Sequence, residues 1–149
     1  MKENIKIAKE LVKVAKSLVS NAYIVPQNIM QWLNRNNFQS CSNNKYCLDT
    51  FSFLMVITIP EFASGEFIVE TSWGGWGRRD VIKATGRNFK EVVKKAINEL
   101  IKNLDSKIKK LEKDLLDNKL KDNMNEKESL ITFYRKGIKE VNDYRNKLL

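Results

Sequence analysis

The residues with the most distinctive chemistry lie close together in the segment SWGGWGRRD, at positions 72–80. Trp76 is followed by Arg78 and Arg79, and glycines surround this tryptophan. An exposed tryptophan beside arginines can stack on nucleic-acid bases and contact phosphates, and the same residue types are typical of protein contact sites. We therefore expect a hairpin tip at which Trp76, Arg78 and Arg79 form a binding site. In the alternative interpretation the glycines merely permit a tight turn, and Trp73 packs into the core of a sheet.

The sequence offers little for catalysis. It contains no histidine, so neither a Ser–His–Asp nor a Cys–His arrangement can form. Glu66 and Glu70 would share one face of a predicted strand, with Glu61 nearby, but no pattern around them marks a pocket. We therefore predict that the chain is not an enzyme and requires no cofactor.

The two cysteines, Cys41 and Cys47, are too few for a zinc site without histidine. We expect reduced thiols, with a local disulfide as the alternative. No apolar run reaches the roughly 18 residues of a membrane span, and lysines interrupt the N-terminal segment, unlike a secretory signal. The expected location is the cytoplasm of a host cell or a virion.

Residues 4–20 predict an amphipathic helix with a seven-residue repeat, IAKELVK followed by VAKSLVS. Apolar residues at alternating spacings of three and four define one face of it: Ile5, Ala8, Val12, Ala15 and Val19. Lysines form a stripe opposite. The apolar face can dock on the rest of the chain, enter a groove of a partner protein, or lie on an anionic membrane. The absence of tryptophan and phenylalanine from this helix argues against the membrane.

This segment resembles N-terminal helices of tailed-bacteriophage proteins, in which repeats of the [IV]AKELVK type occur on otherwise unrelated bodies. The resemblance covers about 17 of the 149 residues. It implies a role in packaging or capsid assembly and assigns no chemistry.

The remaining elements predict an α+β fold. A short helix at 26–35 and a polar loop to about residue 48 precede strands at 50–59, 66–73 and 78–85, which form an antiparallel meander. Asn88 is the expected N-cap of a long helix, which Asp105 and Ser106 interrupt or re-cap. Asn125 begins a last helix to 148 through a capping box with Glu128. We expect an N-terminal helix at 1–22, an α+β core at 23–104 and an antiparallel helical hairpin at 105–149.

The order helix, three antiparallel strands, helix resembles the double-stranded-RNA-binding domain, whose last helix begins with basic residues that contact phosphates. In NFKEVVKKAINELI only Lys90 falls where that family has its lysine cluster, and the family's Gly-Pro and histidine loop is replaced by EFASG. The resemblance implies a nucleic-acid surface at this helix. In that interpretation Arg87, Lys90 and Lys94 act together with the tryptophan turn.

The charge balance is compatible with anionic partners. The chain has 27 basic and 18 acidic residues, a net charge of +9, but residues 89–149 mix sixteen basic with eleven acidic side chains. Mixed charge of this kind is typical of solvated helical faces. We therefore predict a non-enzymatic phage or mobile-element structural, assembly or accessory protein that acts through a protein partner or self-association. A nucleic-acid-binding module is the alternative.

Overall fold

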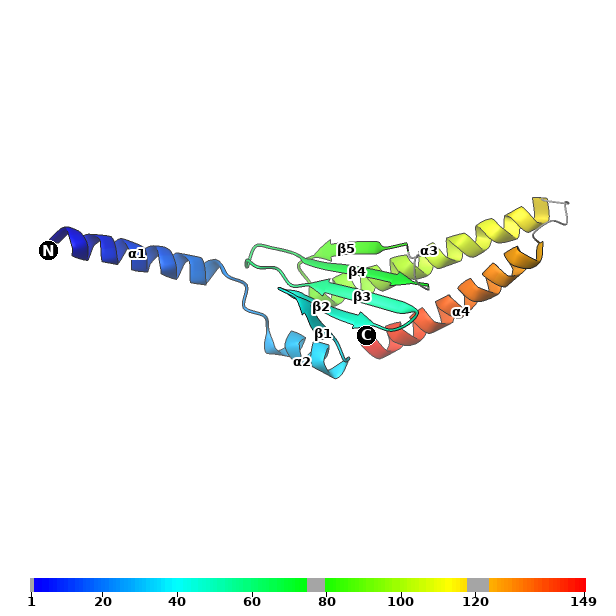
Figure 1. Ribbon diagram of the computed structural model, residues 1–149, viewed down its shortest axis with the longest axis horizontal. Coiled ribbons are helices and arrows are strands. Elements are labelled where there is room, and N and C mark those ends of the chain that lie inside the picture. Colours follow the sequence, from blue (N-terminus) through cyan, green and yellow to red (C-terminus); the bar gives the residue numbers. More distant parts are fainter. Residues whose placement is uncertain (1, 75–79, 118–123) are drawn as a thin grey trace.

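The computed structural model describes residues 2–74, 80–117 and 124–149, with the backbone alone for 14–21. It confirms the predicted α+β class: four helices accompany one antiparallel sheet (Figure 1). The helices are α1 (Lys2–Asn21), α2 (Gln27–Arg35), α3 (Phe89–Asp117) and α4 (Met124–Leu148).

The sheet has five strands in sequence order, two more than the sequence predicts. The strands are β1 (Gln39–Ser42), β2 (Lys45–Asp49), β3 (Phe53–Thr58), β4 (Phe67–Trp73) and β5 (Ile82–Gly86). The predicted meander corresponds to β3, β4 and β5. The expectation of a polar loop up to residue 48 is wrong because β1 and β2 form a hairpin there, with a two-residue turn at Asn43 and Asn44. Asn44 has a φ of 59°, a left-handed conformation that asparagine tolerates better than most residues.

The β1–β2 hairpin also corrects the expectation for the cysteines. Cys41 and Cys47 lie on opposite sides of the turn and form a disulfide, with Cα atoms 6.0 Å apart. The thiols are therefore not free, and the local disulfide that the sequence leaves as the alternative is the one that forms. The bond ties the edge strand β1 to β2.

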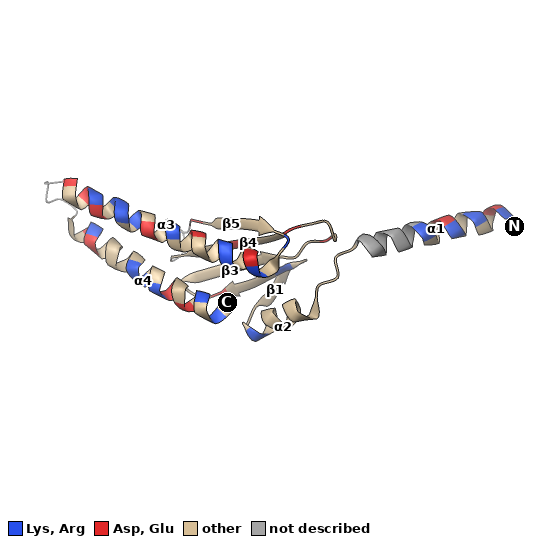
Figure 2. Ribbon diagram, turned by 180° about the vertical axis from the view of Figure 1, so that it is seen from behind, with Lys and Arg blue, Asp and Glu red and all other residues tan. Residues whose placement is uncertain are grey.

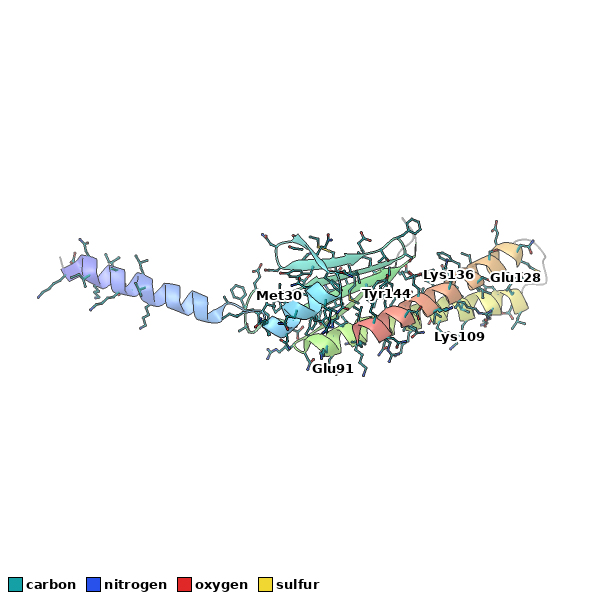
Figure 3. The ribbon with its side chains drawn as sticks, turned by 90° about the horizontal axis from the view of Figure 1, so that it is seen from below. Met30, Glu91, Lys109, Glu128, Lys136 and Tyr144 are labelled. Carbon is teal, nitrogen blue, oxygen red and sulfur yellow. A yellow bond between two sulfur atoms is a disulfide. The ribbon has the colours of Figure 1, made fainter. Side chains whose placement is uncertain are left out.

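The core lies between one face of the sheet and the helices. Figure 3 shows α2, α3 and α4 on the same side of the strands. Alternate residues of β3 are completely buried against them, namely Phe53, Met55 and Ile57. From the helices, Leu33 and Val93 are also completely buried. This alternation is what a sheet covered on one face requires.

Helix α3 begins where the sequence predicts. The Asn88 side chain accepts a hydrogen bond from the backbone N–H of Glu91 at 3.2 Å, so Asn88 is the N-cap. The helix then continues through Asp105 and Ser106 without the expected interruption. Leu104 and Ile108 are both buried, and this continuous apolar stripe holds the helix together.

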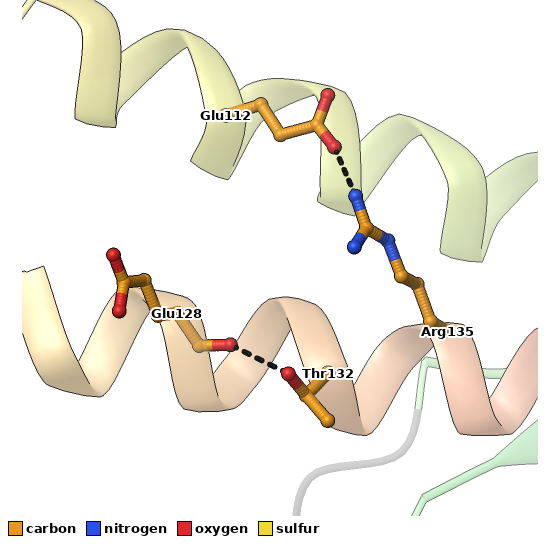
Figure 4. Close-up of polar contacts among 4 residues, drawn as sticks. All are labelled: Glu112, Glu128, Thr132 and Arg135. Carbon is orange, nitrogen blue, oxygen red and sulfur yellow. Dashed lines mark hydrogen bonds and ion pairs between the residues drawn. The ribbon is translucent and has the colours of Figure 1, made fainter.

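Helices α3 and α4 lie side by side and extend beyond the sheet at their far ends (Figure 1). Near the sheet, the Tyr144 ring stacks on Phe53 with centroids 4.3 Å apart. Farther out, Arg135 donates to Glu112 at 2.9 Å, as Figure 4 shows. Asn125 lies inside α4, so the predicted capping box is not formed there.

Helix α1 extends away from the rest of the chain along the long axis of the molecule (Figure 1). The segment after it is attached to the end of the sheet. Ala22 forms an isolated β-bridge with Phe62, and the Tyr23 N–H donates to the Glu61 carbonyl at 2.9 Å. Helix α1 is thus attached to the sheet through the residues that follow its C-terminal end.

Candidate interaction surfaces

The predicted apolar face of α1 is exposed where the structure describes its side chains. Ile5 is 57% exposed and Val12 is 54% exposed, and Ala8 between them is also exposed. Ile7 and Leu11 widen this face and are equally accessible. The side chains of Ala15 and Val19 lie outside the described set. We call Ile5, Ile7, Ala8, Leu11 and Val12 the α1 apolar face.

The C-terminal end of α1 leads into the core through Tyr23. Its ring packs edge-on against Phe67, with centroids 5.6 Å apart. Burial of the phenol raises the pKa of Tyr23 above its usual value of 10.0. This packing holds the segment that follows α1 against the sheet.

Trp76, Arg78 and Arg79 lie outside the described residues, so the expected binding site at this turn stays a prediction. Trp73 is described, and it is buried as the sequence indicates. Its indole N–H donates to Glu140 Oε2 at 3.1 Å, and the other oxygen of Glu140 accepts from the Ser52 hydroxyl. The indole lies directly against Gly137 of α4, where a Cβ atom would be 2.6 Å from Trp73 Cε3. Trp73 therefore joins the sheet to α4.

The predicted basic residues Arg87, Lys90 and Lys94 lie together at the start of α3. The fold adds two cations that the sequence did not link to them. Arg35, at the end of α2, lines a groove of about 490 Å³ with Arg87 and Lys90. Arg145, near the end of α4, lines an adjacent depression with Lys90 and Lys94. We call these five residues the basic cluster.

The ion pairs among the described residues are formed by side chains outside the basic cluster. Lys107 pairs with Asp80 at 2.5 Å, and other pairs lie within α3 or between α3 and α4. Within residues 2–74, 80–117 and 124–149, no member of the basic cluster forms an ion pair. Glu91 is the carboxylate that lines the same depression. Figure 2 shows both signs of charge along α3 and α4, so the cluster is a local excess and not a broad basic face.

A second surface comes from the sheet, whose face opposite the helices carries no described helix (Figure 3). Five residues that alternate with the core positions of β3 and β4 are half-buried there, namely Leu54, Val56, Thr58, Ile68 and Glu70, whereas Ser72, which pairs with Leu54 on the same face, is completely buried. We call them the open sheet face. Its apolar side chains are Leu54, Val56 and Ile68, and polar partners lie beside them, because Val56 is opposite Glu70 and Ile68 is opposite Thr58. No sequence signal separated this face from the core face, since β3 is apolar on both sides.

The described residues offer no metal centre: no group of three or more histidine, cysteine, aspartate or glutamate side chains is placed to hold an ion. None of the described helices is long and apolar enough to cross a membrane.

The chain was compared with protein-family models, curated proteins and solved structures. No family model matches it, and neither a curated protein nor a solved structure is significantly similar.

Proposed function

We propose that this chain is a non-enzymatic binding protein that uses the α1 apolar face to contact another protein. The observation that carries the proposal is the exposure of Ile5, Ile7, Leu11 and Val12 on a helix that extends from the body. An amphipathic helix with an uncovered apolar face gains stability when that face is covered by a groove or a second helix. The phage resemblance of the same segment favours an assembly or accessory role in a phage or mobile element.

The experiment compares the intact chain with the double variant Ile7→Glu/Leu11→Glu as baits in the cell of origin. Bound proteins are identified by mass spectrometry, and self-association is measured in parallel by light scattering. Lys6→Glu/Lys13→Glu is the matched control, because it changes two exposed residues of α1 outside the apolar face. The proposal predicts a partner or an oligomer that survives high salt and is lost only with the first variant. Equal behaviour of the two variants in both assays would reject it.

A nucleic-acid-binding module is the second candidate, supported by the basic cluster. Arg35, Arg87, Lys90, Lys94 and Arg145 come from three different helices or their flanks, and none is ion-paired within the described residues. Cations without carboxylate partners are free to neutralise phosphates. This candidate predicts binding to duplex RNA or DNA that weakens steeply between about 50 and 200 mM salt. Arg87→Ala/Lys90→Ala should reduce the salt dependence, whereas Lys109→Ala/Lys110→Ala should not.

A further inference from the structure

We propose that the α1 apolar face docks on the open sheet face of a second copy of this chain, so that two copies exchange their α1 helices symmetrically. The inference rests on the proposed function, in which α1 contacts a protein, and it names that protein. Within the described part of the chain, one apolar surface on a helix and one on the sheet carry no covering element. A helix packed on a sheet is one of the common ways by which protein layers bury such surfaces.

The open sheet face has the composition of a receiving surface. Val56 and Ile68 lie at its centre, Leu54 lies toward one end, and all three are half-buried. The described helices that follow α1 occupy the opposite face of the sheet (Figure 3). A helix laid over these residues would cover apolar side chains without displacing any described element.

The direction of α1 allows each copy to reach the other. Helix α1 extends along the long axis of the molecule, and β3 and β4 run roughly along the same axis (Figure 1). A two-fold axis near Ala22, perpendicular to this direction, places each α1 alongside the sheet of the other copy. The 20 residues of α1 span about 30 Å. The six residues of β3 span about 20 Å, so the helix is long enough to cover the strand.

The area that this exchange buries is sufficient for a stable dimer. Half the lateral surface of a helix about 10 Å wide, over the roughly 20 Å that β3 spans, is roughly 310 Å². Two helices and the two sheet faces that receive them would together bury roughly 1,260 Å². Stable, specific interfaces typically bury about 1,200–2,000 Å², so this area lies at the lower end of that range.

The turn between β3 and β4 is acidic, whereas α1 is basic. Helix α1 has five lysines and two glutamates, a net charge of +3, and its lysines lie opposite the apolar face. Glu61 and Glu66 are exposed at the turn that the incoming α1 passes first. On the open sheet face, Glu70 lies opposite Lys83 of β5, and Lys45 of β2 lies opposite Thr58 at the turn end, so these lysines offset the charge of Glu70. The charge attraction is therefore limited to the two glutamates of the turn, and apolar contact is the main contribution to docking.

The attachment of α1 disfavours docking on its own sheet. Ala22 is bridged to Phe62, and the Tyr23 N–H is bonded to Glu61, immediately after the helix ends. Folding back would require a complete chain reversal between Asn21 and this attachment. A second copy covers the same surface without moving either hydrogen bond.

The first test is the molar mass of the full chain, measured by light scattering after size exclusion. We expect a dimer in low and high salt. Val56→Lys and Leu11→Glu should each raise the dissociation constant of the dimer at least about tenfold, because each buries a charge in an apolar contact. Leu116→Lys is the matched control, since Leu116 is an exposed apolar residue near the end of α3, away from the open sheet face. Glu70→Lys is a second sheet variant, at a half-buried surface position that does not disturb the core.

The second test identifies which surfaces touch. Chains with Leu11→Cys are mixed with size-tagged chains with Val56→Cys, and a short bismaleimide is added under non-reducing conditions, which keep the native disulfide intact. A cross-linked product containing one chain of each size supports the proposal. A cross-link within single chains that carry both cysteines, without a mixed product, would mean that α1 folds back, and would overturn it.

The outcomes separate this inference from the proposed function. A dimer that is lost with Leu11→Glu but unaffected by both sheet variants would overturn the docking site and leave α1 as the binding element. A monomer at every concentration, with capture of a foreign protein that depends on α1, would overturn self-exchange and leave the proposed function standing. A monomer without α1-dependent capture would overturn both.

Discussion

Gly137→Ala in α4 is the substitution for which local helix propensity and tertiary packing predict opposite results. In an exposed helix interior, alanine in place of glycine stabilises by about 1 kcal/mol. At this position the added Cβ would lie 2.6 Å from Trp73 Cε3, and ordinary contact begins at 3.4 Å. Helix and indole would have to separate by the difference, 0.8 Å.

The surroundings of Trp73 make that separation costly. The indole is buried, its N–H is bonded to Glu140, and its ring lies 4.6 Å from that of Phe133 between centroids. The ring therefore cannot swing into solvent as a flexible side chain would. Inserting an extra carbon into a packed interior costs about 1–3 kcal/mol. After the gain in helix propensity, we expect Gly137→Ala to lower the free energy of unfolding by about 1 kcal/mol.

Urea unfolding followed by circular dichroism measures this change, and a double-mutant cycle isolates its cause. In a Trp73→Leu background the clash is relieved, so Gly137→Ala should stabilise by about 1 kcal/mol and the coupling energy should be about 2 kcal/mol. The reasoning is refuted if Gly137→Ala stabilises both backgrounds equally, with a coupling below about 0.5 kcal/mol.

Three further predictions concern stability. Replacing Cys41 and Cys47 with serine should lower the free energy of unfolding by about 2 kcal/mol, because the disulfide closes a short loop; a reducing agent should reproduce the effect on the native chain in the same urea titration, and a reductant-insensitive midpoint would contradict it. Arg135→Ala should cost less than about 0.5 kcal/mol, since both Arg135 and Glu112 are largely exposed; a loss above 1 kcal/mol would show that this pair fixes the hairpin. Deleting residues 2–21 should leave the unfolding free energy of the body within about 0.5 kcal/mol at concentrations where the chain is monomeric; a larger loss in thermal or urea unfolding would mean that α1 packs on its own body.

Much of the fold could be predicted because hydrophobic periodicity determines it. The apolar segment around Phe53, the alternation of 66–73 and the stripe from Phe89 each predict the correct type of element. β1 and β2 could not be predicted in this way, because every residue of β1 is exposed and polar pairing leaves no periodic signal. The turn at Asn43 and Asn44 is the available signal, but asparagines are common in loops and in hairpin turns alike, so they do not by themselves predict a hairpin.

The candidate surfaces depend more strongly on tertiary structure. The apolar positions of α1 were identified from their spacing, but spacing alone cannot determine whether such a face is covered. Arg35 and Arg145 join the basic cluster only because the ends of α2 and α4 meet the start of α3. Trp32 helps to hold the ends of α2 and α4 together. Its indole N–H donates to the Leu148 carbonyl at 3.0 Å, across 116 positions of sequence.

The disulfide in the β1–β2 hairpin has a consequence for aggregation. An edge strand presents unpaired N–H and C=O groups on which a strand of another molecule can grow, and fibrils propagate in this way. β1 has four residues, its register with β2 shifts between Ser40 and Ser42, and a covalent bond holds it against its neighbour. A short, irregular and cross-linked edge is a poor template for strand addition. The sheet is thereby protected against uncontrolled growth along its β1 edge, while its open face remains available for specific contacts.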